Sequence, residues 1–244
     1  GNEGTSGLIV RGGSSDQNLI LLDGAPVYNA THAFGLFSVF NADAENNVEV
    51  LRSVFPASYG GRLSSVIDVH MKEGDKYNYH GEGGLGLIFS KFSFEGPIKK
   101  GKSSFLVALR RTYADLFLRP IFQITDGDMK MVPFFTDLNV KANFPSGKND
   151  RFYFSFYMGQ DKLKIVEDYT HDDDTASTHF RYDVGFSWGN ITAMTRWNHE
   201  FSKRLFSNFT FTYSRYRFKS WDHYKEEISS PKAVSQEEKS YYSA

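Results

Sequence analysis

From about residue 77 onward, apolar and polar positions alternate along the chain with a period of two. In residues 205–219, Phe209, Phe211 and Tyr213 alternate with asparagine, threonine and serine. The same alternation occurs in three further stretches, 77–89, 92–98 and 151–158. Because successive side chains of a strand point to opposite faces, this pattern predicts antiparallel strands with one aromatic face and one hydroxyl or amide face.

The lengths of these stretches and of their connections favour a membrane barrel. A ten-residue strand tilted by about 45° rises about 23 Å, close to the apolar band of such a barrel. Short connections at 99–102, 145–150 and 202–204 alternate with polar spans at 116–132, 163–179 and 222–240, which we expect to be long loops. A soluble sandwich with uneven loops is an alternative that this pattern leaves open.

The first 75 residues follow a different pattern, with short apolar runs separated by glycine and polar residues. The runs are 8–10, 19–22, 48–50 and 66–69. They predict the strands of a small mixed sheet. Glycine-containing turns are expected at Gly12, Asp23-Gly24 and Tyr59-Gly60-Gly61. Residues 31–44 fit either a short helix or a loop.

Composition narrows the possible functions. The chain has 244 residues, 28 basic and 29 acidic, and a formal net charge of −1, which argues against a dedicated nucleic-acid binder. It has no cysteine, so disulfides, thiolate zinc sites and cysteine nucleophiles are excluded. The sequence contains no apolar run of about 18 residues, so no transmembrane helix is predicted.

Sites of covalent chemistry are not predicted. The stretch Gly12-Gly13-Ser14-Ser15 lacks the lysine and spacing of a phosphate-binding loop. The acidic run at 172–174 is interpreted as a solvated loop in preference to a calcium site. Neither a metal-binding histidine motif nor a nucleophile with its base is recognisable, so we expect no enzyme activity, no cofactor and no metal.

Three motifs of the first 72 residues resemble a known family. They are "LIVRGG" at 8–13, "LILLDGAPVY" at 19–28 and "VEVLRSVFPASYGGRLSSVIDVHMK" at 48–72. In this order they resemble the plug domain of TonB-dependent outer-membrane receptors. The chain departs from the family pattern after Arg52, where Ser53-Val54 stands in place of Gly-Pro. The identity of the solute is therefore not inferred from the resemblance.

The resemblance implies a fold and a location. Residues 1–75 would be the C-terminal part of a small mixed α/β plug domain. Residues 76–244 would be the N-terminal portion of an outer-membrane antiparallel β-barrel, with about seven strands of the roughly 22 in such transporters. An open sheet edge in lipid leaves backbone groups unpaired, so we expect the chain to be part of a longer receptor. The expected location is the bacterial outer membrane.

The resemblance also implies a function and partners. The protein would import a scarce solute, such as a siderophore, cobalamin, a glycan or a peptide, by energy-coupled rearrangement of the plug. A TonB-type periplasmic energy transducer would act on a segment before Gly1, and outer-membrane lipid would surround the barrel. Whether a surface lipoprotein covers the barrel is left open. The alternatives are a passive outer-membrane channel, a surface adhesin or a soluble carbohydrate-binding β-sandwich.

Site residues follow from the matched motifs. In the family, two plug arginines bond glutamates of the inner barrel wall. Arg11 and Arg52 match them, and Glu49 is a local partner for either. Two surface arginines at strand ends are the simpler reading. Candidates for solute contact at the plug apex are Tyr28, His32, Phe34 and Phe37. Aromatic residues near strand ends suit an interfacial girdle: Tyr77, Tyr79, Trp197, Tyr216 and Trp221.

Overall fold

The computed structural model describes residues 17–52, 56–62, 64–113, 129–173, 176–230 and 233–243. The chain divides into two compact units. The first unit holds Gly1–Arg111, Thr136–Gly159 and Asn190–Tyr216, and the second holds Thr112–Phe135, Gln160–Gly189 and Arg217–Ala244. No helix of the described residues is long and apolar enough to cross a membrane.

A small mixed sheet occupies the N-terminal segment, which we define as residues 17–72. Its strands are β1 (Asn18–Leu22), β2 (Ala25–Pro26), β5 (Glu45–Arg52) and β6 (Ser65–Met71), in the order β2-β1-β6-β5. β1 is parallel to β6, and the other pairs are antiparallel. The mixed sheet expected from the short apolar runs is therefore present.

Residues 31–44, which left helix and loop open, contain two very short strands and one helical turn. β3 (Thr31–His32) pairs with β4 (Phe37–Ser38), and the 3-10 helix η2 (Ala33–Gly35) joins them. His32 is thereby fixed at the start of a tight turn. Its side chain is buried, with 1% of its surface exposed.

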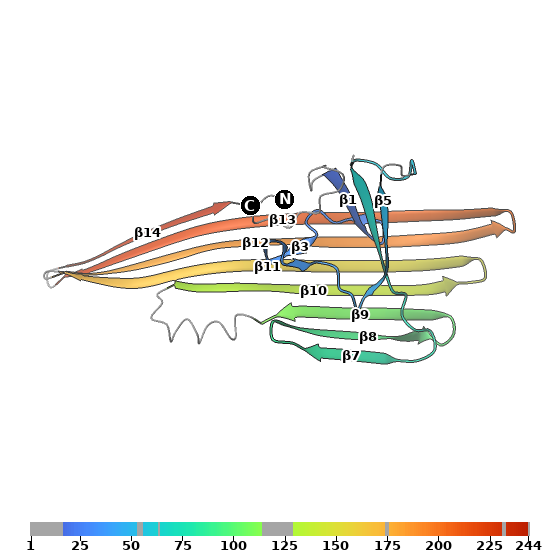
Figure 1. Cartoon of the computed structure of the whole chain (residues 1–244), viewed down its shortest axis with the longest axis horizontal. Helices are drawn as coiled ribbons and strands as arrows, with labels where there is room; N and C mark the ends of the chain where they lie inside the picture. Colours follow the sequence, from blue (N-terminus) through green and yellow to red (C-terminus); the bar gives the residue numbers. More distant parts are fainter. Residues whose placement is uncertain are drawn as a thin grey trace. The chain divides into compact units, whose positions relative to one another are not determined.

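Eight antiparallel strands form the long sheet, in chain order (Figure 1). They are β7 (His80–Leu85), β8 (Phe89–Lys99), β9 (Ser103–Thr112), β10 (Met129–Ser146), β11 (Asp150–Asp173), β12 (Ala176–Ser202), β13 (Leu205–Ser230) and β14 (Ala233–Ser243). The expected antiparallel sheet is confirmed, and the described residues form eight strands where about seven were expected.

Two of the predicted long loops are wrong. Residues 163–173 belong to β11 and 176–179 to β12, and residues 222–230 belong to β13 and 233–240 to β14. Paired side chains show why: Tyr169 stacks on Phe180 at 5.2 Å, and β13 keeps its register with β14 from Ser220 to Ser230. The sequence did not predict these strands, because polar residues occur on both faces and the alternation of apolar and polar positions is lost there. The third span, 116–132, lies largely outside the described residues.

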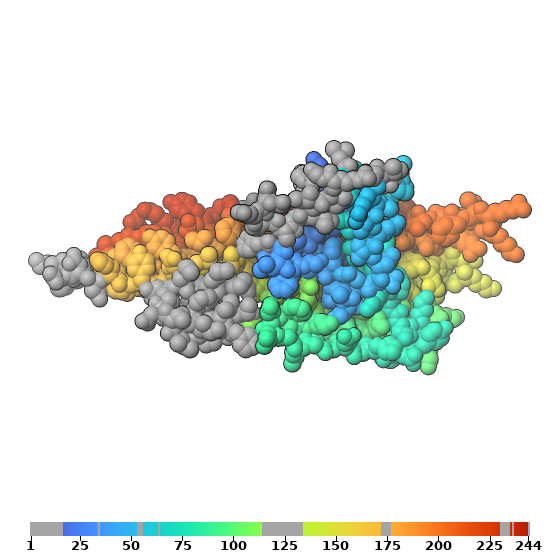
Figure 2. Space-filling view, viewed as in Figure 1, coloured from blue at the N-terminus to red at the C-terminus, as the bar shows by residue number. Residues whose placement is uncertain are grey.

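The core of the first unit joins the N-terminal segment to the long sheet. Leu22, Val39 and Val69 of the N-terminal segment cluster with Leu106 and Tyr157 of the long sheet. In Figure 2, the blue atoms of this segment lie against the green atoms of β8 and β9. The apolar core is small, and polar groups surround it.

Candidate functional site

The inner face of β10, the face toward the N-terminal segment, is polar and buried. Asp137, Asn139, Lys141 and Asn143 occupy alternate positions and are at most 4% exposed. Intervening positions such as Leu138 and Val140 lie on the other face. Buried charges are stable only when they are paired, so this face identifies the strongest candidate site.

The first ionic cluster surrounds Asp23, in the turn between β1 and β2. Lys141 Nζ lies 2.9 Å from Asp23 Oδ1, and Ser155 Oγ donates to Asp23 Oδ2 at 2.7 Å. The backbone N–H of Met71 donates to Oδ1 at 3.2 Å. Asp23 and Gly24 have φ values of +50° and +84°, as a two-residue hairpin turn requires. The expected turn is present, and its carboxylate also binds the long sheet.

The second ionic cluster surrounds Asp137 of β10, which is fully buried. Arg110 Nε and Nη2 donate to Asp137 Oδ2 at 2.9 and 2.7 Å. His32 Nε2 and Tyr157 Oη donate to Oδ1 at 2.7 and 3.0 Å. Because a carboxylate only accepts, the Nε2 atom of His32 carries the hydrogen. Arg110 Nη2 also donates to the carbonyl oxygen of Ser38, at 2.6 Å.

Side chains of the long sheet also bind main-chain carbonyl groups of the N-terminal segment and of Glu73, which follows it. Besides Ser38, the carbonyl oxygens of Pro26, Asn29, Met71 and Glu73 accept such bonds. The donors are Ser214 at 2.5 Å, Asn190 at 2.7 Å, Lys141 at 2.9 Å and Ser104 at 2.7 Å. Side chains of the long sheet thus donate hydrogen bonds to five main-chain carbonyl groups.

The electrostatics of this interface favour reversible contact. A buried ion pair contributes little net stability when both partners return to water, because desolvation offsets their attraction. Removing only one partner leaves a buried charge and costs about 3–5 kcal/mol. The two clusters therefore fix how the N-terminal segment contacts β10, while they contribute little net free energy of stabilisation.

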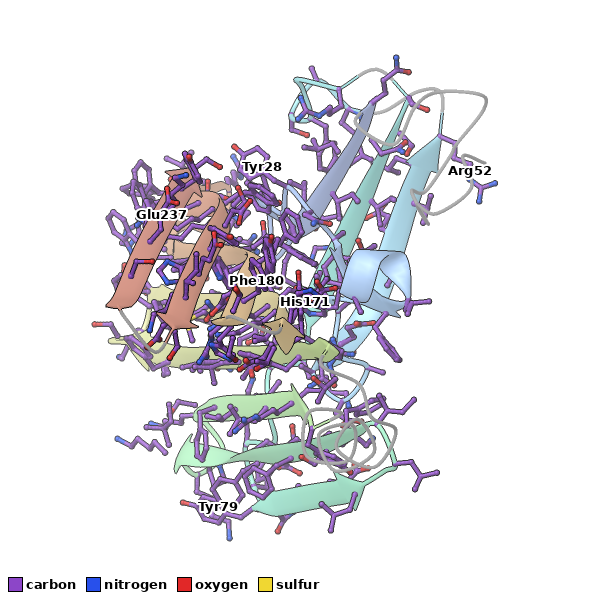
Figure 3. The ribbon with its side chains drawn as sticks, turned by 90° about the vertical axis from the view of Figure 1, so that its left-hand side faces the viewer. Tyr28, Arg52, Tyr79, His171, Phe180 and Glu237 are labelled. Carbon is purple, nitrogen blue, oxygen red and sulfur yellow. The ribbon has the colours of Figure 1, made fainter. Side chains whose placement is uncertain are left out.

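Arg52, an expected lock residue, ends β5 and points outward from it (Figure 3). Glu49 is exposed on the same strand, beside Asp68 of β6. Among the described residues neither makes an ion pair. Arg11 and Gly12 lie outside the described residues. The lock through Arg11 and Arg52 therefore stays a prediction.

The expected turn at Tyr59-Gly60-Gly61 brings a tyrosine onto the small sheet. Tyr59 N donates to Pro56 O at 3.0 Å, and Gly61 has a φ of +83°. Tyr59 Oη donates to Asp68 Oδ2 at 3.2 Å. Burial raises the pKa of the Asp68 carboxyl above its ordinary value, and nearby His70 partly offsets this effect.

The four candidates for solute contact occupy different environments. Tyr28 is 59% exposed, and its backbone N–H donates to Asn190 Oδ1 at 3.2 Å. Phe37 packs edge-on against Phe89 at 6.1 Å. His32 lies in the Asp137 cluster, and the side chain of Phe34 lies outside the described set. Tyr28 is thus the candidate most accessible to a solute.

Sequence reasoning did not identify the residues of the long sheet that build the two clusters. They are Arg110, Asp137, Lys141, Ser155 and Tyr157. A usable signal was present: residues 137–143 alternate charged or amide positions with apolar ones, as do the predicted strands. The pattern marks the polar face, but pairing each charge with its partner requires the register between distant strands.

An aromatic row lies near the short turns of the first unit. Phe144 stacks on Phe152 at 5.8 Å, and Phe152 stacks on Trp197 at 6.2 Å. Trp197 Nε1 donates to Asp150 Oδ1 at 2.7 Å. Aromatic rings with one polar contact are typical of the interface between membrane and water.

The N-terminal stretch of the chain matches a known family. Residues 1–66 match the family described as TonB-dependent Receptor Plug Domain. This stretch is a TonB-dependent receptor plug. The N-terminal segment is therefore called the plug from here on, and the long sheet the wall. Receptors of this family lie in the bacterial outer membrane, the location expected from the sequence.

Two solved structures of receptors are similar to this chain. The siderophore receptor PirA from Pseudomonas aeruginosa is 18% identical, with a TM-score of 0.43 over 94% of this chain and 46% of that one. The siderophore receptor PirA from Acinetobacter baumannii is 11% identical, with a TM-score of 0.47 over 95% of this chain and 51% of that one. The chain spans about half the length of these two receptors. No curated protein matches it.

Proposed function

We propose that the chain belongs to a receptor that imports a scarce solute through the outer membrane by energy-coupled movement of the plug. Residues 1–75 would form the plug domain, and residues 76–244 would contribute wall strands. A TonB-type transducer would supply the force from the periplasm. No covalent step is needed, so the proposed function is not enzymatic.

The observation that carries this proposal is the ionic character of the plug–wall interface. Asp23 and His32 of the plug meet Lys141 and Asp137 of the wall through buried, direct contacts. A permanent interface would be better stabilised by apolar packing of the same volume. Charges that can rehydrate together suit a plug that leaves its seat and returns to it.

A reversible crosslink tests whether the plug must move. The chain has no cysteine, so an Asn29→Cys/Asn190→Cys variant of the full-length protein offers a single disulfide. The side chain of Asn190 reaches the main chain of Asn29, because Asn190 Nδ2 donates to Asn29 O at 2.7 Å, so the two positions are close in space. We expect uptake of the solute to stop when the disulfide forms and to return on reduction. The two single-cysteine variants are the controls.

Uptake that continues at the same rate with the disulfide formed would contradict plug movement. The comparison is made within one variant, so loss of the asparagine hydrogen bonds does not affect it. Uptake should also depend on the transducer. A passive channel, the second candidate function, would conduct the solute without it.

The lock inferred from the family pattern has a separate test. Arg52→Ala in the full-length protein should weaken the coupling of uptake to the transducer or the retention of the plug. Arg62→Ala, an exposed arginine that bonds the carbonyl of Gly61, is a matched control. Unchanged uptake and unchanged plug stability would reject a locking role for Arg52.

A further inference from the structure

One face of the paired strands β13 and β14 combines tyrosine rings with carboxylates. Tyr224 lies opposite Lys239 in the register, and Glu226 lies opposite Glu237. Residues directly opposite each other in an antiparallel pair share a face, as do residues two positions apart on one strand. Tyr182 of β12 belongs to the same face, because its ring centre is 4.8 Å from that of Tyr224. We define the acidic–aromatic patch by these five residues, all of which belong to the second unit.

The negative charges of the patch are only partly neutralised. Glu226 and Glu237 face each other across the two strands, and like charges at directly opposite positions destabilise a sheet. Lys239 Nζ contacts Glu237 Oε1. Tyr224 Oη donates to Glu226 Oε2 at 2.6 Å, and Glu226 makes no ion pair among the described residues. One of the two opposed carboxylates therefore lacks a cationic partner in the part of the chain that the structure describes.

On the opposite face of the same two strands, each glutamate has a basic neighbour. Glu227 Oε2 lies 3.4 Å from Lys225 Nζ, and Glu238 Oε1 lies 3.2 Å from His223 Nε2. These glutamates directly follow the two patch glutamates in the sequence. The face of the patch gains a further carboxylate from Asp222, which is two positions from Tyr224. The excess of negative charge therefore belongs to one face.

The combination of rings and carboxylates fits an organic ammonium group. The face of a tyrosine ring attracts such a cation, and a nearby carboxylate adds Coulomb attraction. A hard metal ion prefers oxygen ligands and gains less from aromatic rings. The protein already places one ammonium group here, because Lys239 lies opposite Tyr224 and contacts Glu237. The side chains of Glu237 and Lys239 are 54% and 53% exposed, so a cation from solution can reach them.

We propose that the acidic–aromatic patch binds the ammonium groups of organic cations such as polyamines. A bound ammonium group offsets the repulsion between Glu226 and Glu237 and lies against the rings of Tyr182 and Tyr224. Lys239 competes with it for the carboxylate of Glu237. This inference is independent of the proposed solute import and of the movement of the plug.

Calorimetric titration of the full-length protein in neutral detergent tests this site, with spermidine as the probe. The patch variant is Glu226→Gln/Glu237→Gln, and the matched control is Glu227→Gln/Glu238→Gln. Both remove two carboxylates from the same stretch of β13 and β14, but from opposite faces. We expect spermidine to bind the wild type and the control, and to bind the patch variant about tenfold more weakly, since each exposed ion pair changes affinity up to about fivefold.

Removal of the competing lysine should have the reverse effect. Lys239→Gln should bind spermidine about threefold more tightly than the wild type, because Glu237 loses its internal partner. A misfolded variant would not gain affinity, so this measurement separates the site from a folding defect. Lys225→Gln is the control, since Lys225 contacts a glutamate two positions away in the same manner but on the opposite face.

The contribution of the rings is tested with Tyr182→Leu/Tyr224→Leu. This variant should bind spermidine about fivefold more weakly, while its affinity for Mg²⁺ should match that of the wild type. The proposal would be overturned if spermidine did not bind, if it bound all variants equally, or if the tyrosine variant lost affinity for Mg²⁺ and spermidine alike. These titrations need no transducer, so their failure would leave the crosslink test of plug movement unaffected.

Discussion

At the level of single residues, the plug is positioned by carboxylates that each serve several partners. Asp137 accepts bonds from Arg110, Tyr157 and His32, so a residue of the plug completes a pair already formed within the wall. Asp23 holds its own turn and also binds Lys141. Replacing either carboxylate therefore affects more than one contact.

Lys141→Met should destabilise the seated plug by about 3–5 kcal/mol, because the Asp23 carboxylate would stay buried without its cation. Chemical unfolding of the full-length protein in detergent measures this change. Lys148→Met, at an exposed turn, is the control and should change stability little. Adding Asp23→Asn to Lys141→Met should recover part of the loss. An additive double variant would show that the two groups are not coupled.

Asp68 should make the stability of the plug depend on pH. Its pKa in the folded state is raised by burial, so folding favours the protonated acid. The stability it contributes is therefore complete below the ordinary pKa of the group and is lost as the pH rises through the raised value. Asp68→Asn should be more stable than the wild type at neutral pH, with a difference that shrinks on acidification. Thermal unfolding across this pH range provides the measurement.

At the level of elements, the sequence predicts strands best where one face is apolar. β8 and the first half of β13 were expected from the alternation in 92–98 and 205–219. The parts of β11 to β14 within 163–173, 176–179, 222–230 and 233–240 were not predicted as strands, because polar residues occur on both of their faces. There, backbone pairing and ring contacts such as Tyr182–Tyr224 at 4.8 Å maintain the strands. Local sequence carries little information about such long-range pairing.

Gly159 of β11 shows how one small residue supports the Asp137 cluster. A Cβ atom at this position would lie 2.0 Å from Tyr157 Oη and 2.9 Å from Asp137 Oδ1. Gly159→Ala should displace the tyrosine hydroxyl and cost about 1–3 kcal/mol in unfolding free energy. Gly60→Ala meets no atom within 4 Å and is the control. Equal stability of the two variants would show that the tyrosine moves without loss.

At the level of the whole molecule, the wall presents a polar face where the plug sits. The groups that the plug covers include Ser104, Asp137, Asn139, Lys141 and Ser155. The alternation along β10 indicates this polar face in the sequence, but not which plug residue meets each position. A face of this kind can be hydrated, unlike the interior of a typical domain.

Deleting residues 1–72 from the full-length protein should therefore leave the wall folded. Water would replace the plug at most of its polar contacts, and the loss would concentrate at Leu106 and Tyr157, which pack against plug residues. Heat-modifiable migration in gels and circular dichroism of the strands would measure the outcome. A wall that unfolds or aggregates without the plug would show that the two parts form one cooperative core.

The five carbonyl groups that the wall recognises have an evolutionary consequence. A main-chain oxygen is the same in every amino acid, so a grip on Pro26, Ser38 or Asn29 does not depend on which side chain those positions carry. Side chains at these positions of the plug can therefore vary between related proteins while the hydrogen bonds from the wall stay the same. One wall could in this way accommodate a series of plugs with different outward chemistry.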